Sequence, residues 1–175
     1  CTRPLPEGAR FCPFCGHEVE PHGNEERRVV TVVFADLVGY TSLSEHLDPE
    51  RVKRIVDRAF QRLIAEIHRF GGEVDKVLGD GILAIFGAPV AHEDDPERAV
   101  LAALAMQDAI SRYADELAEQ SGIELLLRVG INTGEVIAAS VGDSRQHAEE
   151  TAMGRAIALA ARMETASEPG TVLVS

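Results

Sequence analysis

Two aspartates stand where a carboxylate could hold a metal ion against a phosphate chain. Asp36 follows the apolar run 29–35 and precedes a short loop with good helix-opening residues. Asp80 lies between two glycines, directly after another apolar run, 77–78. A carboxylate beside loop and helix N–H groups suits Mg²⁺ bound to phosphate. Two such carboxylates are consistent with a two-metal nucleotide site.

Each aspartate also has a simpler interpretation. Gly-Asp-Gly is ordinary turn chemistry, because Asp favours turns for local reasons, and Asp36 could be a helix-capping acid. In a ferredoxin-like sheet, however, the first strand lies beside the central hairpin, so Asp36 and Asp80 would meet at one rim. A main-chain carbonyl such as that of Leu37 would add an oxygen ligand of the kind that hard cations prefer. The pair together therefore favours a metal site.

A lysine lies in the strand that leads to Asp80. Alternation places Val74, Lys76 and Leu78 on one face of this strand, which is more apolar than the other. A lysine there is costly unless it is paired or extends to solvent. Lys76 is therefore either a lysine that reaches out near a sheet edge or a donor to a ligand at an interface.

Turn and cap signals divide the rest of the chain into strands and helices. Residues 48–50 (Asp-Pro-Glu) give an N-cap, a proline at the first helical position and an acid in the first turn, and a helical apolar stripe follows. Residues 132–134 (Asn-Thr-Gly) predict a hairpin turn. The order β-α-β-β-α-β-β-α-β predicts an α+β, ferredoxin-like fold with helices packed on an antiparallel-rich sheet. The expected strands are Val29–Ala35, Glu73–Leu78, Ile82–Phe86, Leu125–Ile131, Glu135–Val141 and Thr171–Val174. The expected helices run from Asp48 to Gly71, from Asp95 to about Glu119 and from about Arg155 to Thr165. Gly142–Glu150 is expected to be a loop.

Composition limits the partners of the chain. Its 175 residues suit one compact domain with a small appendage, and 17 basic against 29 acidic residues give a formal net charge of −12. This charge argues against nucleic acid or an anionic membrane as the main partner, although metal ions can offset the phosphates of a nucleotide. The longest apolar run, Ala99–Met106, is far shorter than the roughly 20 residues needed to span a bilayer. The expected location is the cytoplasm.

All three cysteines lie in the first 15 residues. Cys12 and Cys15 form a Cys-x-x-Cys knuckle, in which a tight turn brings two thiolates to one metal ion, and Cys1 stands upstream. With a fourth ligand before Cys1, these residues would complete a zinc ribbon. The alternative is a redox or free cysteine pair, and zinc would bind weakly with three cysteines alone. The expected organisation is a partial zinc ribbon over 1–17, a linker over 18–27 and one domain over 28–175.

Over residues 28–175 the chain resembles a class III nucleotidyl cyclase catalytic domain, preceded by a segment that resembles a truncated zinc ribbon. Four motifs carry the resemblance in the family's order. They are Phe34-Ala35-Asp36-Leu37-Val38-Gly39-Tyr40-Thr41, Lys76 to Gly87 (KVLGDGILAIFG), Arg128 to Gly134 (RVGINTG) and Gly154 to Glu164 (GRAIALAARME).

The resemblance implies cyclisation of ATP or GTP, in which the ribose 3′-hydroxyl attacks the α-phosphate and pyrophosphate leaves. Asp36 and Asp80, with Leu37, would hold two Mg²⁺ or Mn²⁺ ions. Lys76 and Thr151 match the positions that read the base, and this combination resembles an ATP-preferring bacterial type. Arg162 matches the arginine that stabilises the charge growing on phosphorus.

The resemblance also implies further substrate contacts by Gly39, Tyr40 and Thr41. In the family the sites form between two protomers, with the metals from one and the base readers from the other. A homodimer is therefore expected, or a heterodimer with another cyclase domain.

The chain departs from the family pattern at three positions. Ala158 replaces an asparagine that orients the ribose, and alanine cannot form this hydrogen bond. Glu150 replaces an aromatic residue, and Arg155 replaces an acid. Two interpretations follow: an adenylate cyclase domain of reduced activity, or a regulatory domain that binds ATP and metal with little turnover. An unrelated two-metal phosphoryl-transfer domain is a third, which gives Lys76 and Arg162 no role.

Overall fold

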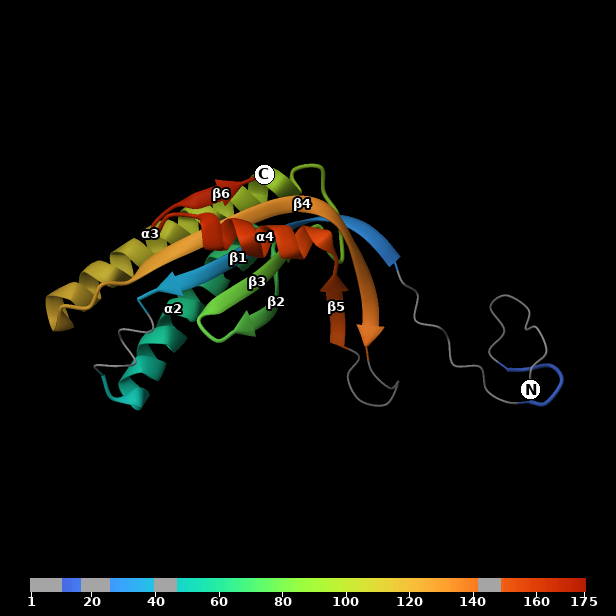
Figure 1. The fold of residues 1–175 in the computed structure, drawn as a ribbon, viewed down its shortest axis with the longest axis horizontal. Coiled ribbons are helices and arrows are strands. Elements are labelled where there is room, and N and C mark those ends of the chain that lie inside the picture. Colours follow the sequence, from blue (N-terminus) through green and yellow to red (C-terminus); the bar gives the residue numbers. More distant parts are fainter. Residues whose placement is uncertain (1–10, 17–25, 40–46, 142–148) are drawn as a thin grey trace.

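The computed structural model of the chain describes residues 11–16, 26–39, 47–141 and 149–175. Within these ranges it is an α+β fold in which three helices pack on one sheet, as the sequence predicts (Figure 1). The loop predicted at 142–150 and the linker predicted at 18–27 lie mostly outside the described residues. The strands are β1 (Glu26–Val38), β2 (Glu73–Leu78), β3 (Gly81–Phe86), β4 (Leu126–Val141), β5 (Glu149–Met153) and β6 (Val172–Val174), and the helices are α2 (Pro49–Arg69), α3 (Asp95–Ser121) and α4 (Arg155–Ala166).

The sheet brings the two sequence motifs that contain aspartates next to each other. Its order is β2-β3-β1-β4-β5, all antiparallel pairs, and β6 adds to β4 in parallel. In this register Asp36 of β1 stands opposite Gly81 of β3 on one side and opposite Arg128 of β4 on the other. The predicted neighbourhood of the first strand and the central hairpin is therefore confirmed.

The two faces of the sheet have separate cores. Helices α2 and α3 cover one face over a large apolar cluster that includes Val33, Leu63 and Met106. Helix α4 covers the other face over a smaller cluster that includes Val32 and Leu83. Figure 1 shows α4 in front of β1 and β4, with α2 and α3 behind the sheet. Alternate residues of β1 therefore face different helices.

Helix α2 begins as the cap signal predicts. The Asp48 side chain accepts a hydrogen bond from the backbone N–H of Glu50 at 2.9 Å, and Pro49 occupies the first turn. The buried residues of the helix form one stripe. They are Val52, Ile55, Val56, Ala59, Phe60, Leu63 and Ile67.

The predicted hairpin at residues 132–134 is wrong, because β4 continues through them as one strand of 16 residues. Its partner β1 has 13 residues, longer than the predicted Val29–Ala35, and pairs with β4 along its whole length. The turn-type side chains have tertiary partners instead. The Thr133 hydroxyl lies 2.9 Å from that of Thr31, and the Asn132 amide donates to the carbonyl oxygen of Ala156 at 3.1 Å. The strand that follows β4 in the chain and pairs with it is β5.

The prediction that Lys76 shares a face with Val74 is also wrong. A bulge lies between Val74 and Lys76, so the alternation shifts by one residue. Val74 packs against the core below α2, whereas Lys76 stands opposite Leu83, which belongs to the cluster below α4. Since residues opposite each other in a sheet share a face, Lys76 lies on the α4 face.

Candidate active site

A backbone hydrogen bond places Asp36 and Asp80 at one rim of the sheet. The N–H of Leu37 donates to the carbonyl oxygen of Asp80 at 3.0 Å, one residue beyond the Asp36–Gly81 pair. Burial is the main cause that raises the pKa of the Asp36 carboxyl, and the nearby charge of Asp80 adds to this rise. The expectation that the two residues lie at one rim of the sheet is therefore confirmed.

The backbone of Leu37 is oriented to add an oxygen at the same rim. In an antiparallel strand, the N–H and C=O of one residue leave the strand on the same side. Because the Leu37 N–H points to Asp80, its carbonyl also faces the β2–β3 turn. The Leu37 side chain is buried in the apolar cluster below α2 and α3.

The two carboxylate oxygens of Asp36 face different groups. Oδ2 accepts a hydrogen bond from Nη2 of Arg128 at 2.8 Å. Oδ1 points toward the hairpin turn, since a Cβ atom built on Gly81 would lie 3.6 Å from it. Burial raises the pKa of the Asp36 carboxyl above its ordinary value, and the hydrogen bond from Arg128 opposes this rise. Arg128 thus fixes the carboxylate with one oxygen directed to the Asp80 side.

A second acid lies on the other side of Arg128. Oε1 of Glu164, on α4, is 3.1 Å from Nε of Arg128, although the N–H is not aligned as a hydrogen bond. The Glu164 side chain is 9% exposed, against 27% for Arg128. Burial raises the pKa of the Glu164 carboxyl, and the charge of Arg128 acts in the opposite direction.

Sequence reasoning missed Arg128 and Glu164 as site residues, although each carries a signal. Arg128 is a charged residue between Leu127 and Val129 in a strand covered on both faces. Glu164 continues the buried stripe of α4 four residues after Ala160. A charge on a buried face needs a partner, and here each residue is the partner of the other.

The donor set at this rim fits Mg²⁺ or Mn²⁺. Two carboxylates and a main-chain carbonyl are hard oxygen ligands, and Mg²⁺ commonly uses one or two carboxylates and takes its other oxygens from water and substrate phosphates. The described residues contain no group of three or more His, Cys, Asp or Glu side chains that could enclose a metal ion.

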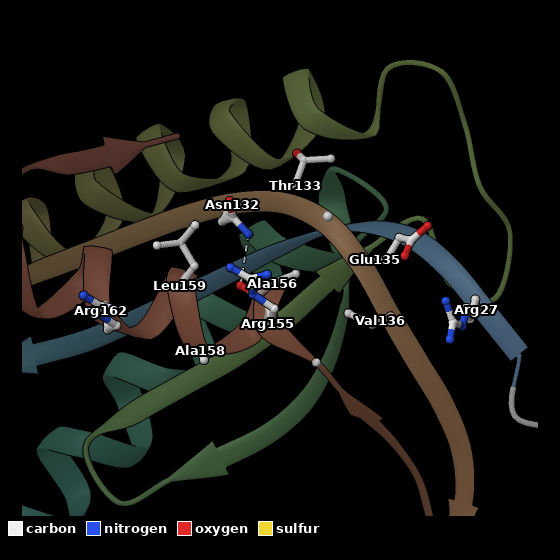
Figure 2. Close-up of a pocket in the computed structure, with 12 residues that line it drawn as sticks. Arg27, Asn132, Thr133, Glu135, Val136, Arg155, Ala156, Ala158, Leu159 and Arg162 are labelled. Atoms are coloured by element: carbon white, nitrogen blue, oxygen red, sulfur yellow. Dashed lines mark hydrogen bonds between the residues drawn. The ribbon is translucent and has the colours of Figure 1, made fainter.

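A separate pocket of about 720 Å³ lies beside the first turns of α4 (Figure 2). Arg155, Ala158, Leu159 and Arg162 recur at helical spacing on one side of α4 and line it together with the bend of β4. Ala158 and Arg162, which the resemblance relates to ribose and phosphate, are therefore neighbours on one exposed stripe.

The predicted catalytic residues do not all meet within one chain. Neither Asp36 nor Asp80 is among the described residues that line the α4 pocket, which holds Arg162. Lys76 is half-buried on β2, on the same face of the sheet as Asp36. The α4 pocket and the carboxylate rim are therefore described as two separate places on this chain.

The structure describes only some of the other residues predicted to contact the substrate. Gly39 has φ +103°, and a Cβ atom there would lie 3.0 Å from the Glu124 carbonyl oxygen, so the turn requires glycine. Tyr40 and Thr41 lie outside the described residues. Thr151 belongs to β5, of which the backbone is described. The binding roles of these four residues stay predictions.

Cys12 and Cys15 are the two described residues of the predicted zinc ribbon, which would need four ligands. The N–H of Gly16 donates to the carbonyl oxygen of Cys12 at 2.9 Å and closes the turn that contains Cys15. Backbone N–H groups, that of Phe14 foremost, lower the pKa of the Cys12 thiol, as suits a thiolate ligand. Cys1 lies outside the described residues, so the ribbon stays a prediction.

An α+β domain with two carboxylates at one rim and an arginine pocket on its covering helix has the layout of a domain that acts on metal-bound phosphates. Residues 23–175 match the model of the adenylate and guanylate cyclase catalytic domain. The chain belongs to this family, the class III nucleotidyl cyclases, which are lyases that use divalent metal ions. No helix among the described residues is long and apolar enough to cross a bilayer.

Relatives include both adenylyl and guanylyl cyclases. The uncharacterized protein Rv1318c of Mycobacterium tuberculosis (strain ATCC 25618 / H37Rv) is 39% identical over 87% of the chain, which spans only 27% of that relative. The crystal structure of the guanylyl cyclase Cya2 has a TM-score of 0.81 at 35% identity, covering 87% of this chain and 77% of that one. The adenylyl cyclase CyaB from P. aeruginosa also has a TM-score of 0.81, at 31% identity, covering 86% and 78%.

Proposed function

We propose that this domain converts ATP to cyclic AMP and pyrophosphate at a site shared by two cyclase domains. The observation that supports this most directly is the meeting of Asp36 and Asp80 at one rim while Arg162 lies in a separate pocket. Asp36, Asp80 and the carbonyl of Leu37 would hold two Mg²⁺ or Mn²⁺ ions. These ions supply charge that makes the 3′-oxygen a better nucleophile and grips the triphosphate.

Other residues of the chain would bind the phosphates and stabilise the charge that grows on them. Arg162 is exposed on α4 with no ion pair to the described residues, so its guanidinium is available to donate to the α-phosphate oxygens as charge grows there. The 3′-hydroxyl would lose its proton to solvent as its oxygen forms the new bond to the α-phosphorus. The bond to the bridging oxygen would break, and pyrophosphate would leave with that oxygen. Gly39, Tyr40 and Thr41 would position the phosphate chain.

Dimerisation is typical of the family, and this chain needs it for geometric reasons. Asp36 stands at the end of β1 near the β2–β3 turn, whereas the α4 pocket lies beside the bend of β4 (Figures 1 and 2). In a symmetric pair, the carboxylate rim of one copy would face the α4 pocket of the other, which gives two equivalent sites. A heterodimer would instead give one complete site.

The preference for ATP rests on Lys76 and Thr151. A lysine donates hydrogen bonds and a threonine hydroxyl both donates and accepts, so the pair can read the edge of adenine. Solved relatives include one adenylyl and one guanylyl cyclase of similar likeness, so overall similarity does not choose between the bases. Measuring cyclic AMP and cyclic GMP side by side tests this part of the proposal.

A second candidate is a regulatory domain that binds ATP and metal but turns over little. Ala158 supports it, because this residue faces the α4 pocket and offers no group to the ribose. Loss of one positioned transition-state contact costs on the order of 10²-fold in rate.

The deciding experiment measures cyclic AMP formed by the purified chain with ATP and Mn²⁺, together with ATP binding under the same conditions. Product formation that requires both ATP and Mn²⁺ supports the cyclase. Clear ATP binding with no product would refute it in favour of the regulatory domain. Absence of both would refute both candidates.

A further inference from the structure

Glu164 occupies an unusual position for an acid. It lies on the face of α4 that packs on the sheet, with its side chain 9% exposed. An ionised carboxylate in such a place is costly unless it is paired. Among the described residues its charged partner is Arg128 at 3.1 Å, and the Thr165 hydroxyl donates to its other oxygen at 3.2 Å.

The backbone of α4 fixes this position closely. A Cβ atom on Gly130 would lie 2.2 Å from the backbone nitrogen of Glu164 and 2.3 Å from the carbonyl oxygen of Ala160. The helix therefore rests directly on β4 at this glycine. Arg128 lies two residues before Gly130 in β4, hence on the same face, directly below the Glu164 carboxylate.

The arginine passes this contact on to Asp36. Its Nη2 donates to Oδ2 of Asp36 at 2.8 Å, while its Nε faces Glu164. One rigid, planar guanidinium thus joins the two carboxylates, and its orientation sets which Asp36 oxygen stays directed to the turn that carries Asp80.

We propose that Glu164 is a positioning residue for the metal site: it holds Arg128, and through Arg128 it orients the Asp36 carboxylate toward Asp80. This rests on the proposed function in one respect, that Asp36 and Asp80 bind the divalent ion. Without the Glu164 charge, Arg128 turns fully to Asp36, occupies its oxygens and competes with the metal ion. Outer partners of metal ligands typically change metal affinity by about 10–100-fold.

The experiment is a double-mutant cycle on Mn²⁺ binding by the nucleotide-free chain, followed by electron paramagnetic resonance of free Mn²⁺. Glu164→Gln keeps the shape of the side chain and its bond from Thr165. We expect it to weaken Mn²⁺ binding about tenfold in the native background. In the Arg128→Met background, the same change should alter Mn²⁺ affinity by less than about twofold, because the relay no longer exists.

Two controls separate this role from simpler ones. Glu168→Gln makes the same charge change at an exposed site four residues further along, and should leave Mn²⁺ affinity unchanged. Thermal unfolding of each variant reports whether it folds, and Arg128→Gln, which also lacks the charge, replaces Arg128→Met if the latter does not fold.

The outcomes are distinct. An equal loss of affinity from Glu164→Gln with and without Arg128 would mean a through-space charge effect and would overturn the proposal, as would no loss in the native background. If Asp36→Ala does not reduce Mn²⁺ binding, the proposed metal site itself fails, which is a different result. Loss in the native background alone, with Asp36→Ala abolishing binding, establishes the role of Glu164.

Discussion

The backbone N–H of Leu37 donates to the carbonyl oxygen of Asp80 at 3.0 Å, which ties the end of β1 to the β2–β3 turn. This bond places two acidic residues from distant parts of the sequence at one rim of the sheet. Burial is the main cause of the raised pKa of Asp36, and repulsion from the nearby Asp80 carboxylate adds to it. A divalent cation at the proposed metal site would relieve this repulsion.

Asp36→Ala should abolish Mn²⁺-dependent ATP binding. The change removes one of the two rim carboxylates and leaves the Arg128 cation beside the metal position, so both ligand number and charge become unfavourable. Isothermal titration of ATP with and without Mn²⁺ measures the effect. Asp115→Ala, at an exposed site on α3, removes the same group and should change nothing. Unaltered Mn²⁺ dependence in Asp36→Ala would place the metal site elsewhere.

Ala158→Asn should raise the turnover of ATP by about 10²-fold, the size of one positioned transition-state contact. The side chain at this position is exposed in the α4 pocket, so asparagine fits without repacking the core. Cyclic AMP formation at saturating ATP measures it. Ala158→Leu adds similar volume with no polar group and is the matched control. If asparagine and leucine give equal rates, the alignment of α4 with the family is wrong.

The sequence predicted the carboxylate rim because local signals there agree with the fold. Asp36 directly follows the apolar run 29–35, and Asp80 lies between the two glycines of a hairpin turn. The turn signal at Asn132 and Gly134 failed because tertiary contacts outweighed it. Strand β1 has 13 residues and pairs with β4, which favours a continuous β4 strand. The Asn132 amide donates to a carbonyl oxygen of α4, so a turn is not needed to satisfy it.

Lys76 and Glu164 show why strand alternation and helical spacing alone did not predict the positions of these side chains. One bulge in β2 moved Lys76 to the other face of the sheet, and nothing in the strand sequence marks where a bulge will occur. Glu164 was visible as an acid on an apolar stripe, but its partner Arg128 is 36 positions away in the sequence. Only the register of β4 under α4 identifies that pair.

Lys76→Glu should shift or remove the preference between ATP and GTP without unfolding the domain. The side chain is half-buried on β2, at one end of the strand order, so a carboxylate can reach solvent there. Competition binding of ATP and GTP measures the preference, and thermal unfolding checks the fold. Lys53→Glu makes the same charge change on α2 and should keep the preference. A collapse of the unfolding temperature would instead indicate a structural lysine.

Gly130→Ala should destabilise the domain by at least about 3 kcal/mol, at the upper end for overpacked sites. The added methyl group would lie 2.2 Å from the backbone nitrogen of Glu164, so α4 must move. Denaturant unfolding measures the loss. Gly134→Ala is the control in the same strand: its methyl group would lie 3.1 Å from the Cβ of Ala156, and a smaller loss is expected. Equal losses would contradict the direct packing of α4 on Gly130.

The metal-free domain should gain stability from Asp36 as the pH falls. Burial raises the pKa of this carboxyl above its ordinary value of 3.8, so the folded state binds the proton more tightly than the unfolded state does. Between the ordinary and the raised pKa, the free energy of unfolding therefore increases with acidification, and the penalty of the charged form is complete above the raised pKa. Mn²⁺ binding should change in the opposite direction, because protons compete for the same oxygens. Unfolding temperatures of the native chain and Asp36→Asn across this window measure the first effect, and Mn²⁺ titrations of the native chain measure the second. If the difference between native and Asp36→Asn stability does not vary with pH, the carboxyl is not perturbed in the folded state.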